Sequence, residues 1–223
     1  MLDLSSAALF DLSHTLAAPL LENCDEPWRA LPKLKEFIIS LGSTLDPVLY
    51  NSPSEGVWIA KTAVVAPTAV ITAPAIIGDN TEVRHCAYLR GATLIGDNCV
   101  VGNSCELKNC IIFDNVQVPH FNYVGDSILG YYSHMGAGAV TSNVKSDHSP
   151  VALHHGNEKI ETDMKKLGAL IGDFAEIGCN SVLNPGTVIG KHSRVYPLTS
   201  VRGTVPPDSI VKSANTIVPL KKS

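Results

Sequence analysis

The sequence lacks an excess of charge of either sign and lacks long apolar runs. Its 223 residues carry 17 Lys and Arg against 21 Asp and Glu, so no basic surface of the kind that binds nucleic acid is expected. No apolar run approaches the length of a membrane span, and residues 1–10 contain Asp3 but no Lys or Arg, unlike a secretory signal. We therefore expect a cytoplasmic protein that binds neither nucleic acid nor a membrane.

Closely spaced cysteine pairs are also missing, because none of the six cysteines forms a C-x-x-C motif. Cys99 and Cys105 occupy equivalent positions of successive six-residue units, where a compact apolar side chain is favoured. The others are scattered along the chain at Cys24, Cys86, Cys110 and Cys179. We expect reduced thiols rather than disulfides or a zinc site.

What the sequence does contain is a six-residue period. Every sixth residue from Ile59 to Phe113 is aliphatic or aromatic, and the spacing resumes from Ile171 to Val201. Four positions after most of these residues stands a small or compact side chain, for example Ala63. Repeats of this length form parallel β-helices, in which three hexads make one triangular coil about 4.8 Å tall. The pattern resembles the hexad of left-handed β-helix proteins, a class dominated by acyltransferases, so we predict an all-β, left-handed parallel β-helix.

Residues 1–56 do not follow the period. Ser5 and Ser6 are candidates to cap a helix that continues to Leu20, and residues 32–41 predict a second helix that stops at Gly42. Prolines at 47 and 53 and a glycine at 56 then indicate a linker. We expect this segment to be a helical cap on the exposed edge of the first coil; a role in substrate recognition is the alternative.

The β-helix is expected over residues 57–206, with a loop extruded at about 142–168 and a tail at 207–223. The loop is polar and breaks the period, so it must leave the prism. It is either a functional loop whose ends are fixed by the rigid repeat or a solvated excursion. The tail is expected to leave the β-helix, where it either contacts a neighbouring subunit or is disordered.

The period fails around His120. The next two core positions in the series would be Pro119 and Gly125, which cannot fill them, whereas Val124 and Leu129 each arrive one residue early. Departures from an otherwise consistent pattern are expected at functional or strained sites.

A longer resemblance covers these irregular hexads. The segment from Arg90 to Asn143 resembles the acetyltransferase domain of the bifunctional bacterial enzyme that acetylates glucosamine 1-phosphate and then uridylylates it. Order and spacing agree without gaps in the following pieces: Leu89-Arg90, Val101-Gly102-Asn103, Glu106-Leu107-Lys108, residues 120–126 and residues 136–143. Two differences leave the exact substrate open: His134 replaces a substrate-contacting Asn, and Lys145 is only a candidate for a later lysine. The glycine-rich signature of the nucleotidyltransferase half is absent from this sequence.

The resemblance implies that His120 is the general base. A neutral imidazole, with a pKa of about 6.5, can accept the proton of an amine that attacks a thioester. The alternative is a histidine that merely fills a corner. Arg90 and Lys108 stand eighteen residues apart, one complete coil, so they stack on one face. Matching family residues hold the substrate phosphate, and a planar guanidinium beside an ammonium suits that ligand; a solvated pair is the alternative.

The resemblance also implies further binding residues. Tyr123 and Asn143 match positions that hydrogen-bond the sugar and orient its amine. The sequence Gly136-Ala137-Gly138 leaves backbone amides open for a pantetheine arm or an oxyanion, although a tight turn would favour the same residues. Left-handed β-helix acyltransferases form threefold trimers with the acyl donor between subunits, which implies an acetyl-CoA site that uses Ala137, Cys179, Asn180, Pro197 and Leu198.

These observations predict an acyltransferase that N-acetylates an amino-sugar 1-phosphate with acetyl-CoA, as a homotrimer and without a metal. The alternative is a non-catalytic sugar-phosphate-binding or trimerisation module that works with a separate nucleotidyltransferase. A zinc hydratase of the same fold is disfavoured, because His85, His120 and His134 do not have the spacing of that family.

Overall fold

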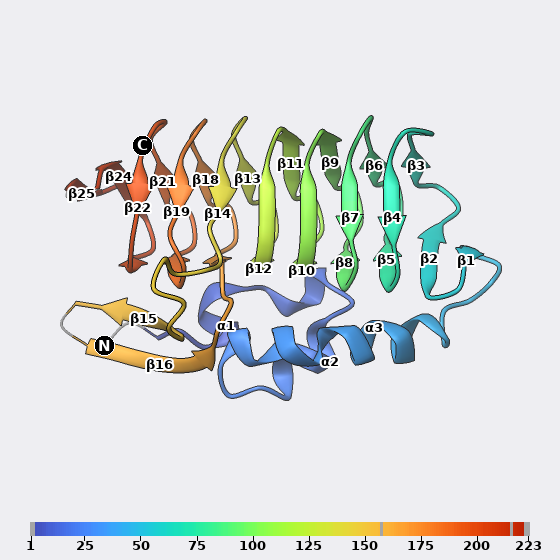
Figure 1. Cartoon of the computed structure of the whole chain (residues 1–223), viewed down its shortest axis with the longest axis horizontal. Helices are drawn as coiled ribbons and strands as arrows, with labels where there is room; N and C mark the ends of the chain where they lie inside the picture. The colour runs from blue at the N-terminus through green and yellow to red at the C-terminus, as the bar shows by residue number, and fades with distance from the viewer. Residues whose placement is uncertain (1–2, 157, 215, 221–223) are drawn as a thin grey trace.

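The computed structural model describes residues 3–156, 158–214 and 216–220. The chain winds into a long stack of parallel strands (Figure 1). In the regular coils paired residues lie eighteen positions apart, as in Val70 with Tyr88 and Ala75 with Thr93. The parallel β-helix predicted from the hexads is confirmed.

The strands form three columns. The front column in Figure 1 consists of β4 (Val70–Thr72), β7 (Tyr88–Arg90), β10 (Glu106–Ile112), β12 (Tyr123–Leu129), β14 (Val140–Thr141), β19 (Val182–Leu183) and β22 (Ser200–Val201). The second column is a nine-stranded sheet of β3 (Val64–Val65), β6 (Glu82–Val83), β9 (Val100–Asn103), β11 (Gln117–His120), β13 (His134–Met135), β18 (Glu176–Ile177), β21 (Arg194–Val195), β24 (Ser209–Ser213) and β25 (Thr216–Pro219). The third contains β1 (Tyr50–Ser54), β2 (Val57–Ala60), β5 (Ala75–Ile77), β8 (Thr93–Ile95), β17 (Ala169–Ile171), β20 (Thr187–Ile189) and β23 (Thr204–Val205), together with the ends of β10 and β12.

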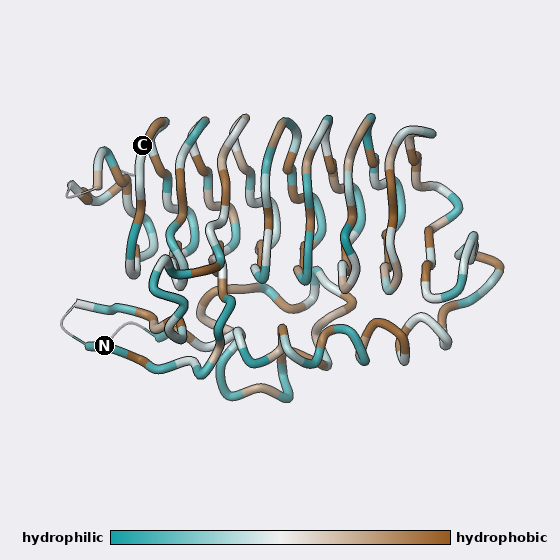
Figure 2. The backbone as a smooth tube through the Cα atoms, viewed as in Figure 1, coloured by the Kyte–Doolittle hydropathy of each residue, from teal (hydrophilic) through white to brown (hydrophobic). Residues whose placement is uncertain are grey.

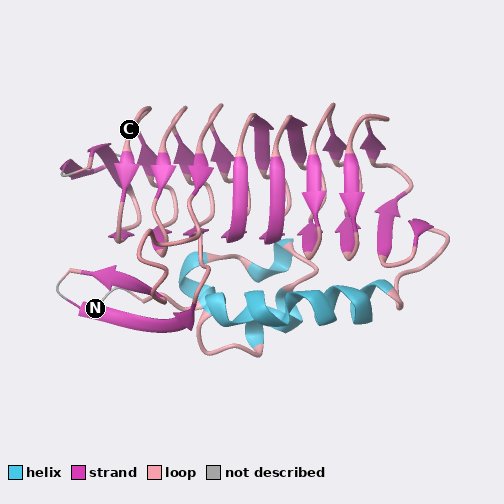
Figure 3. Ribbon diagram, viewed as in Figure 1, coloured by secondary structure: helices cyan, strands magenta, loops and turns pink. Residues whose placement is uncertain are grey.

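The middle strands of the third column, β5, β8, β17 and β20, are buried on both sides. Ile77 and Ile95 point to the axis, and the preceding residues Ile76 and Leu94, which point the other way, are equally inaccessible to solvent. The N-terminal segment covers them with α1 (Ser6–Leu9), η1 (Leu12–His14), α2 (Ala18–Glu22), η2 (Pro27–Lys33) and α3 (Leu34–Gly42). All helices therefore lie on one side of the prism (Figure 3).

The N-terminal segment differs from the expectation in two respects. Helix α1 ends at Leu9 and does not continue to Leu20, because the backbone beyond it bonds to the β-helix: Asp11 N donates to Asp173 Oδ2, and Asp114 N donates to His14 O. The segment also lies along several coils instead of covering the first one, since α3 contacts β5, β8 and β10 while η2 contacts β10 and β12. The edge of β2 is covered by β1, which pairs with it in the antiparallel sense inside the expected linker.

Two coils are one residue short. Leu107 pairs with Leu89, eighteen positions earlier, but Ile112 pairs with Ile95, only seventeen earlier. The residue is lost between Leu107 and Ile112, so the first slip lies one hexad before the place expected from the sequence. A second five-residue step leads from Val124 to Leu129, as predicted. Both short steps occur at the same corner, where β10 and β12 bend without interruption.

The loop beyond Asn143 forms the hairpin of β15 (Val151–His155) and β16 (Glu158–Met164), outside both large sheets. It is not simply solvated, because Val151 and Leu153 are fully buried and β15 contacts β20 and β23. The expectation that residues 207–223 leave the β-helix is wrong: β24 pairs in parallel with β21, and β25 turns back along β24. Residues 221–223 of that tail lie outside the described part of the chain.

Hydrophobic segments recur along every coil and in the helical segment beside them (Figure 2). Together they form one continuous core, in which Phe10 of the N-terminal segment packs on Phe113 of the β-helix with ring centroids 5.2 Å apart. In the described part of the chain, no helix has the length and apolar character needed to cross a membrane.

Candidate functional site

His120 ends β11 at an exposed corner between the second and front columns. Successive coils bond through the backbone at this corner: Gly138 N donates to His120 O, Asn180 N to Ala137 O, and Leu198 N to Cys179 O. The structure therefore aligns His120 with the residues predicted to bind the acyl donor. We call this set the His120 corner: His120, Phe121, Ala137, Gly138, Cys179, Asn180, Pro197 and Leu198.

The His120 corner exposes apolar side chains. Phe121 is 63% exposed and Leu198 is 80% exposed, and both have a left-handed φ, 53° and 59° respectively. The same left-handed φ recurs at other corners of the prism, for example at Tyr132 and Phe174, so it belongs to the fold, and the greater exposure of the side chains is what marks this corner. The imidazole of His120 is exposed as well, and it makes no hydrogen bond or ion pair with any residue that the structure describes.

Only one of the three amides in Gly136-Ala137-Gly138 is open. Gly136 N donates to Ile177 O at 2.7 Å, and Gly138 N donates to His120 O at 2.9 Å. Both therefore hold successive coils together. For Ala137 N, no acceptor occurs among the described residues. The sequence predicted several free amides here. The structure leaves one, the N–H of Ala137, one coil above His120.

Arg90 and Lys108 lie on the same outer face, in the register expected from their spacing. Each already has an acidic partner, however. Arg90 Nη1 lies 2.8 Å from Glu106 Oε1, and Lys108 Nζ lies 2.9 Å from Asp126 Oδ1. Carboxylates of the chain itself thus balance both charges, and the expected phosphate clamp is not preformed.

Tyr123 and Asn143 are brought together on the front face beside this ion pair. Asn143 Nδ2 donates to the Tyr123 hydroxyl at 3.2 Å and to Asp126 Oδ2 at 2.5 Å. Burial raises the pKa of Tyr123 above its ordinary value, and the charge of Asp126 adds to the effect, which the Asn143 hydrogen bond opposes. Asp126 has no role predicted from the sequence, although it stands eighteen residues after Lys108 within the matched segment.

His134 is not part of this group. It begins β13, and its Nδ1 lies 2.8 Å from Glu176 Oε2 on the outer face of the second column. In the described residues, no three His, Cys, Asp or Glu side chains gather in a way that could hold a metal ion.

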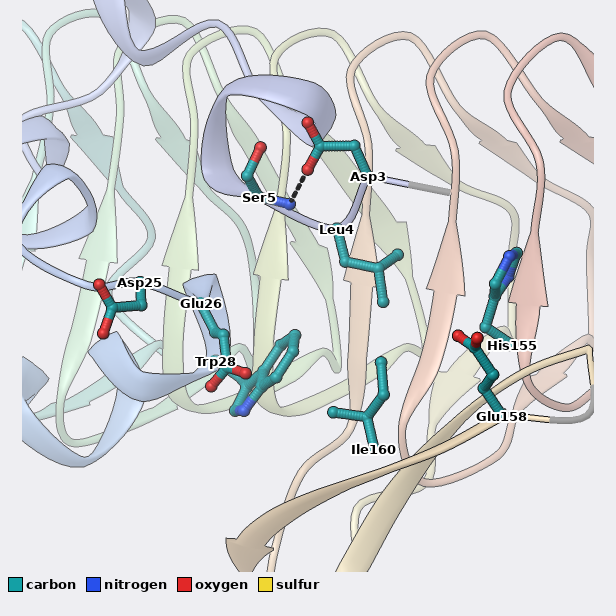
Figure 4. Close-up of a pocket in the computed structure, with 9 residues that line it drawn as sticks. All are labelled: Asp3, Leu4, Ser5, Asp25, Glu26, Trp28, His155, Glu158 and Ile160. Carbon is teal, nitrogen blue, oxygen red and sulfur yellow. Dashed lines mark hydrogen bonds between the residues drawn. The ribbon is translucent and has the colours of Figure 1, made fainter. Parts of the chain in front are cut away.

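A separate pocket lies where the N-terminal segment meets the β15–β16 hairpin (Figure 4). Leu4 and Ile160 face each other across it, and carboxylates such as Asp3 and Glu158 line its rim. Asp3 accepts a hydrogen bond from Ser5 N at 2.8 Å. None of the site residues predicted from the sequence is among the described residues that line this pocket.

Comparison with known proteins identifies relatives over the same coils. A family model, the GMPPB C-terminal domain, matches residues 87–146. A bifunctional protein GlmU of Methanococcus maripaludis is 33% identical over 198 residues, which make up 88% of this chain and 48% of that protein. The resemblance to the GlmU proteins is confirmed. A bifunctional sugar-1-phosphate nucleotidylyltransferase/acetyltransferase of Sulfurisphaera tokodaii is 34% identical over 111 residues, or 50% of this chain and 28% of that protein.

The chain spans about half the length of the GlmU protein from Methanococcus maripaludis. Among solved structures, a mutant of AntD, an N-acyltransferase from Bacillus cereus in complex with dTDP and coenzyme A, is similar at 18% identity. The match covers 74% of this chain and 84% of that one with a TM-score of 0.47.

Proposed function

We propose that this chain is a hexapeptide-repeat acyltransferase that moves an acetyl group from acetyl-CoA to the amine of an amino-sugar 1-phosphate, such as glucosamine 1-phosphate. The observation that carries the proposal is the His120 corner, where the backbone aligns His120 and Ala137 with the predicted donor-binding residues, and where neither the imidazole nor the Ala137 N–H has a partner among the described residues. Similarity to proteins named for sugar-1-phosphate nucleotidylyltransferase and acetyltransferase activities supports the same reaction class.

The reaction needs one base and one oxyanion donor. The amine nitrogen attacks the thioester carbonyl carbon, and its proton passes to the free nitrogen of His120. The carbonyl oxygen becomes negative as the new C–N bond forms, and the Ala137 N–H is the donor proposed to stabilise it. The C–S bond then breaks, and the thiolate leaves with the proton that His120 has collected.

The acceptor is proposed to bind on the front face next to this corner. Tyr123 and Asn143 offer polar groups to the sugar. Arg90 is the cation proposed for the phosphate, because its side chain is 52% exposed and a surface ion pair is its only link to the described residues. Lys108 is less available, since its partner Asp126 is nearly buried. The acyl donor is proposed to lie along the exposed corner residues between neighbouring copies of a homotrimer.

The decisive experiment follows acetyl transfer with purified protein. Acetyl-CoA is supplied with glucosamine 1-phosphate, and the N-acetylated product is measured by mass spectrometry because the exposed Cys86 and Cys179 would interfere with thiol reagents. His120→Ala is expected to lower kcat by about 10²–10⁴-fold, the usual contribution of a general base. Arg194→Ala, an exposed change on the second column, serves as the control. A wild-type protein that forms no product with any amino-sugar phosphate would overturn the proposal.

A second candidate function is a non-catalytic sugar-phosphate-binding or trimerisation module that works with a separate nucleotidyltransferase. The observation that favours it is His134, which replaces a substrate-contacting Asn of the resembling family and pairs with Glu176 instead of joining the proposed acceptor site. Calorimetry separates the two functions. Binding of the sugar phosphate without binding of coenzyme A, together with recovery of a nucleotidyltransferase in a pull-down, would select the second.

A further inference from the structure

The Asp126 carboxylate is the centre of a polar network under the proposed acceptor site. Its side chain is 4% exposed, yet it accepts hydrogen bonds from three groups: Lys108 Nζ at 2.9 Å, Asn109 Nδ2 at 2.8 Å and Asn143 Nδ2 at 2.5 Å. An ionised carboxylate can only accept hydrogen bonds. The amide nitrogen of Asn143 must therefore face Asp126, and the orientation of this amide is fixed by charge.

The fixed amide in turn fixes the hydroxyl of Tyr123. Asn143 Nδ2 has two hydrogens, one directed to Asp126 and the other to the Tyr123 oxygen. Because the Tyr123 oxygen accepts that bond, its own hydrogen points elsewhere. In the described part of the chain, neither Asn143 Oδ1 nor the Tyr123 hydroxyl proton has a further partner. One acceptor and one donor are thus left side by side.

The backbone is shaped for this arrangement. A Cβ atom on Gly125 would lie 2.4 Å from the Tyr123 hydroxyl and 2.8 Å from Asn143 Nδ2, so only glycine lets both groups lie over this strand. Asn109 and Asp126 have left-handed φ values of 50° and 47° at the corner where both short steps occur. Asn109 and Asp126 thus stand at the turns of the two shortened hexads, where their side chains bond to each other.

We propose that Asp126 is a positioning residue that sets the acceptor specificity of this site. By orienting Asn143 and Tyr123, it presents an acceptor for an amine hydrogen and a donor for a neighbouring oxygen. The ligand class that matches is a vicinal amino alcohol, in which the amine and a hydroxyl stand on adjacent carbons. This inference rests on the proposed acyl transfer for its substrate, but the network itself can be tested without turnover.

The main test is Asp126→Asn, with Asp173→Asn as the matched control. Asp173 is likewise nearly buried and lies 3.0 Å from Lys191, but it anchors the N-terminal segment at another corner. In Asp126→Asn we expect KM for the amino-sugar phosphate to rise at least about tenfold, with KM for acetyl-CoA unchanged, because an asparagine no longer dictates the orientation of Asn143. In the control Asp173→Asn, both KM values should stay within about twofold of those of the wild type.

The second readout is the phenol titration of Tyr123, followed by ultraviolet absorbance against Tyr123→Phe. Removal of the Asp126 charge should lower the pKa of Tyr123, whereas Asn143→Leu, which keeps the Lys108–Asp126 pair, should raise it by removing a hydrogen bond. If Asp126→Asn does not fold, the expected rise in the pKa of Tyr123 in Asn143→Leu becomes the deciding measurement. Unchanged titration in the folded variants, or an unchanged KM for the acceptor in Asp126→Asn, would overturn the inference. A wild type without turnover but with these opposite shifts would refute the acyltransferase proposal and leave the positioning role intact.

Discussion

Lys108 Nζ lies 2.9 Å from the 4% exposed side chain of Asp126, while Arg90 reaches Glu106 in a pair whose side chains are 52% and 35% exposed. Two cations that stand one coil apart thus differ in how firmly each is held. The first pair belongs to the interior of the site, and the second can exchange its carboxylate for another anion.

The two cations should therefore respond differently to removal. Lys108→Ala leaves a buried carboxylate without its counter-ion, and we expect a loss on the order of 2 kcal/mol in the free energy of unfolding, below that of a fully buried pair. Arg90→Ala should change it by less than about 1 kcal/mol, but should raise KM for a phosphorylated acceptor. Urea denaturation and steady-state kinetics measure the two effects. Equal losses of stability would contradict the distinction.

Asp97 should make the protein less stable as the pH rises. Burial raises the pKa of Asp97; the hydrogen bond that Asp79 N donates to Asp97 Oδ1 at 2.7 Å opposes this effect, and repulsion from the Asp79 carboxylate adds to it. A carboxyl whose folded pKa is raised binds its proton more tightly in the folded state, so its stabilising contribution is complete below the ordinary pKa of 3.8 and is lost as the pH rises through the folded value.

Asp97→Asn keeps an acceptor for Asp79 N but cannot ionise. We therefore expect the variant to gain stability relative to the wild type between pH 4 and pH 7, measured as the difference in denaturation midpoint at each pH. A difference that does not change with pH would contradict the assignment.

Trp28 tests whether the N-terminal segment is part of the core. Its side chain is 1% exposed, in a helix that contacts β10 and β12. Trp28→Ala should lower the free energy of unfolding by about 3–5 kcal/mol, the usual cost of removing a buried aromatic side chain. Val48→Ala, at a 71% exposed position, should change it by less than about 0.5 kcal/mol. A folded segment that docks only loosely would give similar values for both.

Two exposed and two buried cysteines should react with a thiol reagent at different stages. Burial raises the pKa of Cys99 to about 12 and also raises that of Cys110, whereas Cys86 and Cys179 are exposed. Because only the thiolate reacts, a short pulse of iodoacetamide at pH 8 should modify Cys86 and Cys179 in the native protein and the buried pair only after unfolding. Peptide mapping by mass spectrometry gives the order. Native labelling of Cys99 would show that the coil opens locally.

The β-helix was predictable because its period is set by side chains that every coil must bury. The sequence also contains a pattern that indicates burial of the third column on both sides. Two adjacent aliphatic residues recur once per coil, as in Ile76-Ile77, Leu94-Ile95 and Leu170-Ile171. One member faces the axis and the other needs an outside cover. That cover is the N-terminal segment, whose path depends on contacts such as Asp11 with Asp173 across 162 positions, which local helix signals cannot reveal.

The candidate site was predictable only in part. The spacing of Arg90 and Lys108 gave their common face, but the first short step was misplaced because Phe113 satisfies the six-residue rule as well as Ile112 does. The pairing places Ile112 in the axial series, while Phe113 packs against Phe10. The role of Asp126 depends on hydrogen bonds between side chains of adjacent coils, and spacing alone does not determine them.

The reversed strands at the two ends of the stack limit how copies of this chain can associate. β1 and β25 run against their neighbours, and each contains a proline, Pro53 or Pro219, that has no amide hydrogen. An open coil would be a template on which another molecule could add in parallel, as in a growing fibril. The reversed strands interrupt that growth on one column at each end, since β1 covers the first parallel strand of the third column and β25 covers the last parallel strand of the second.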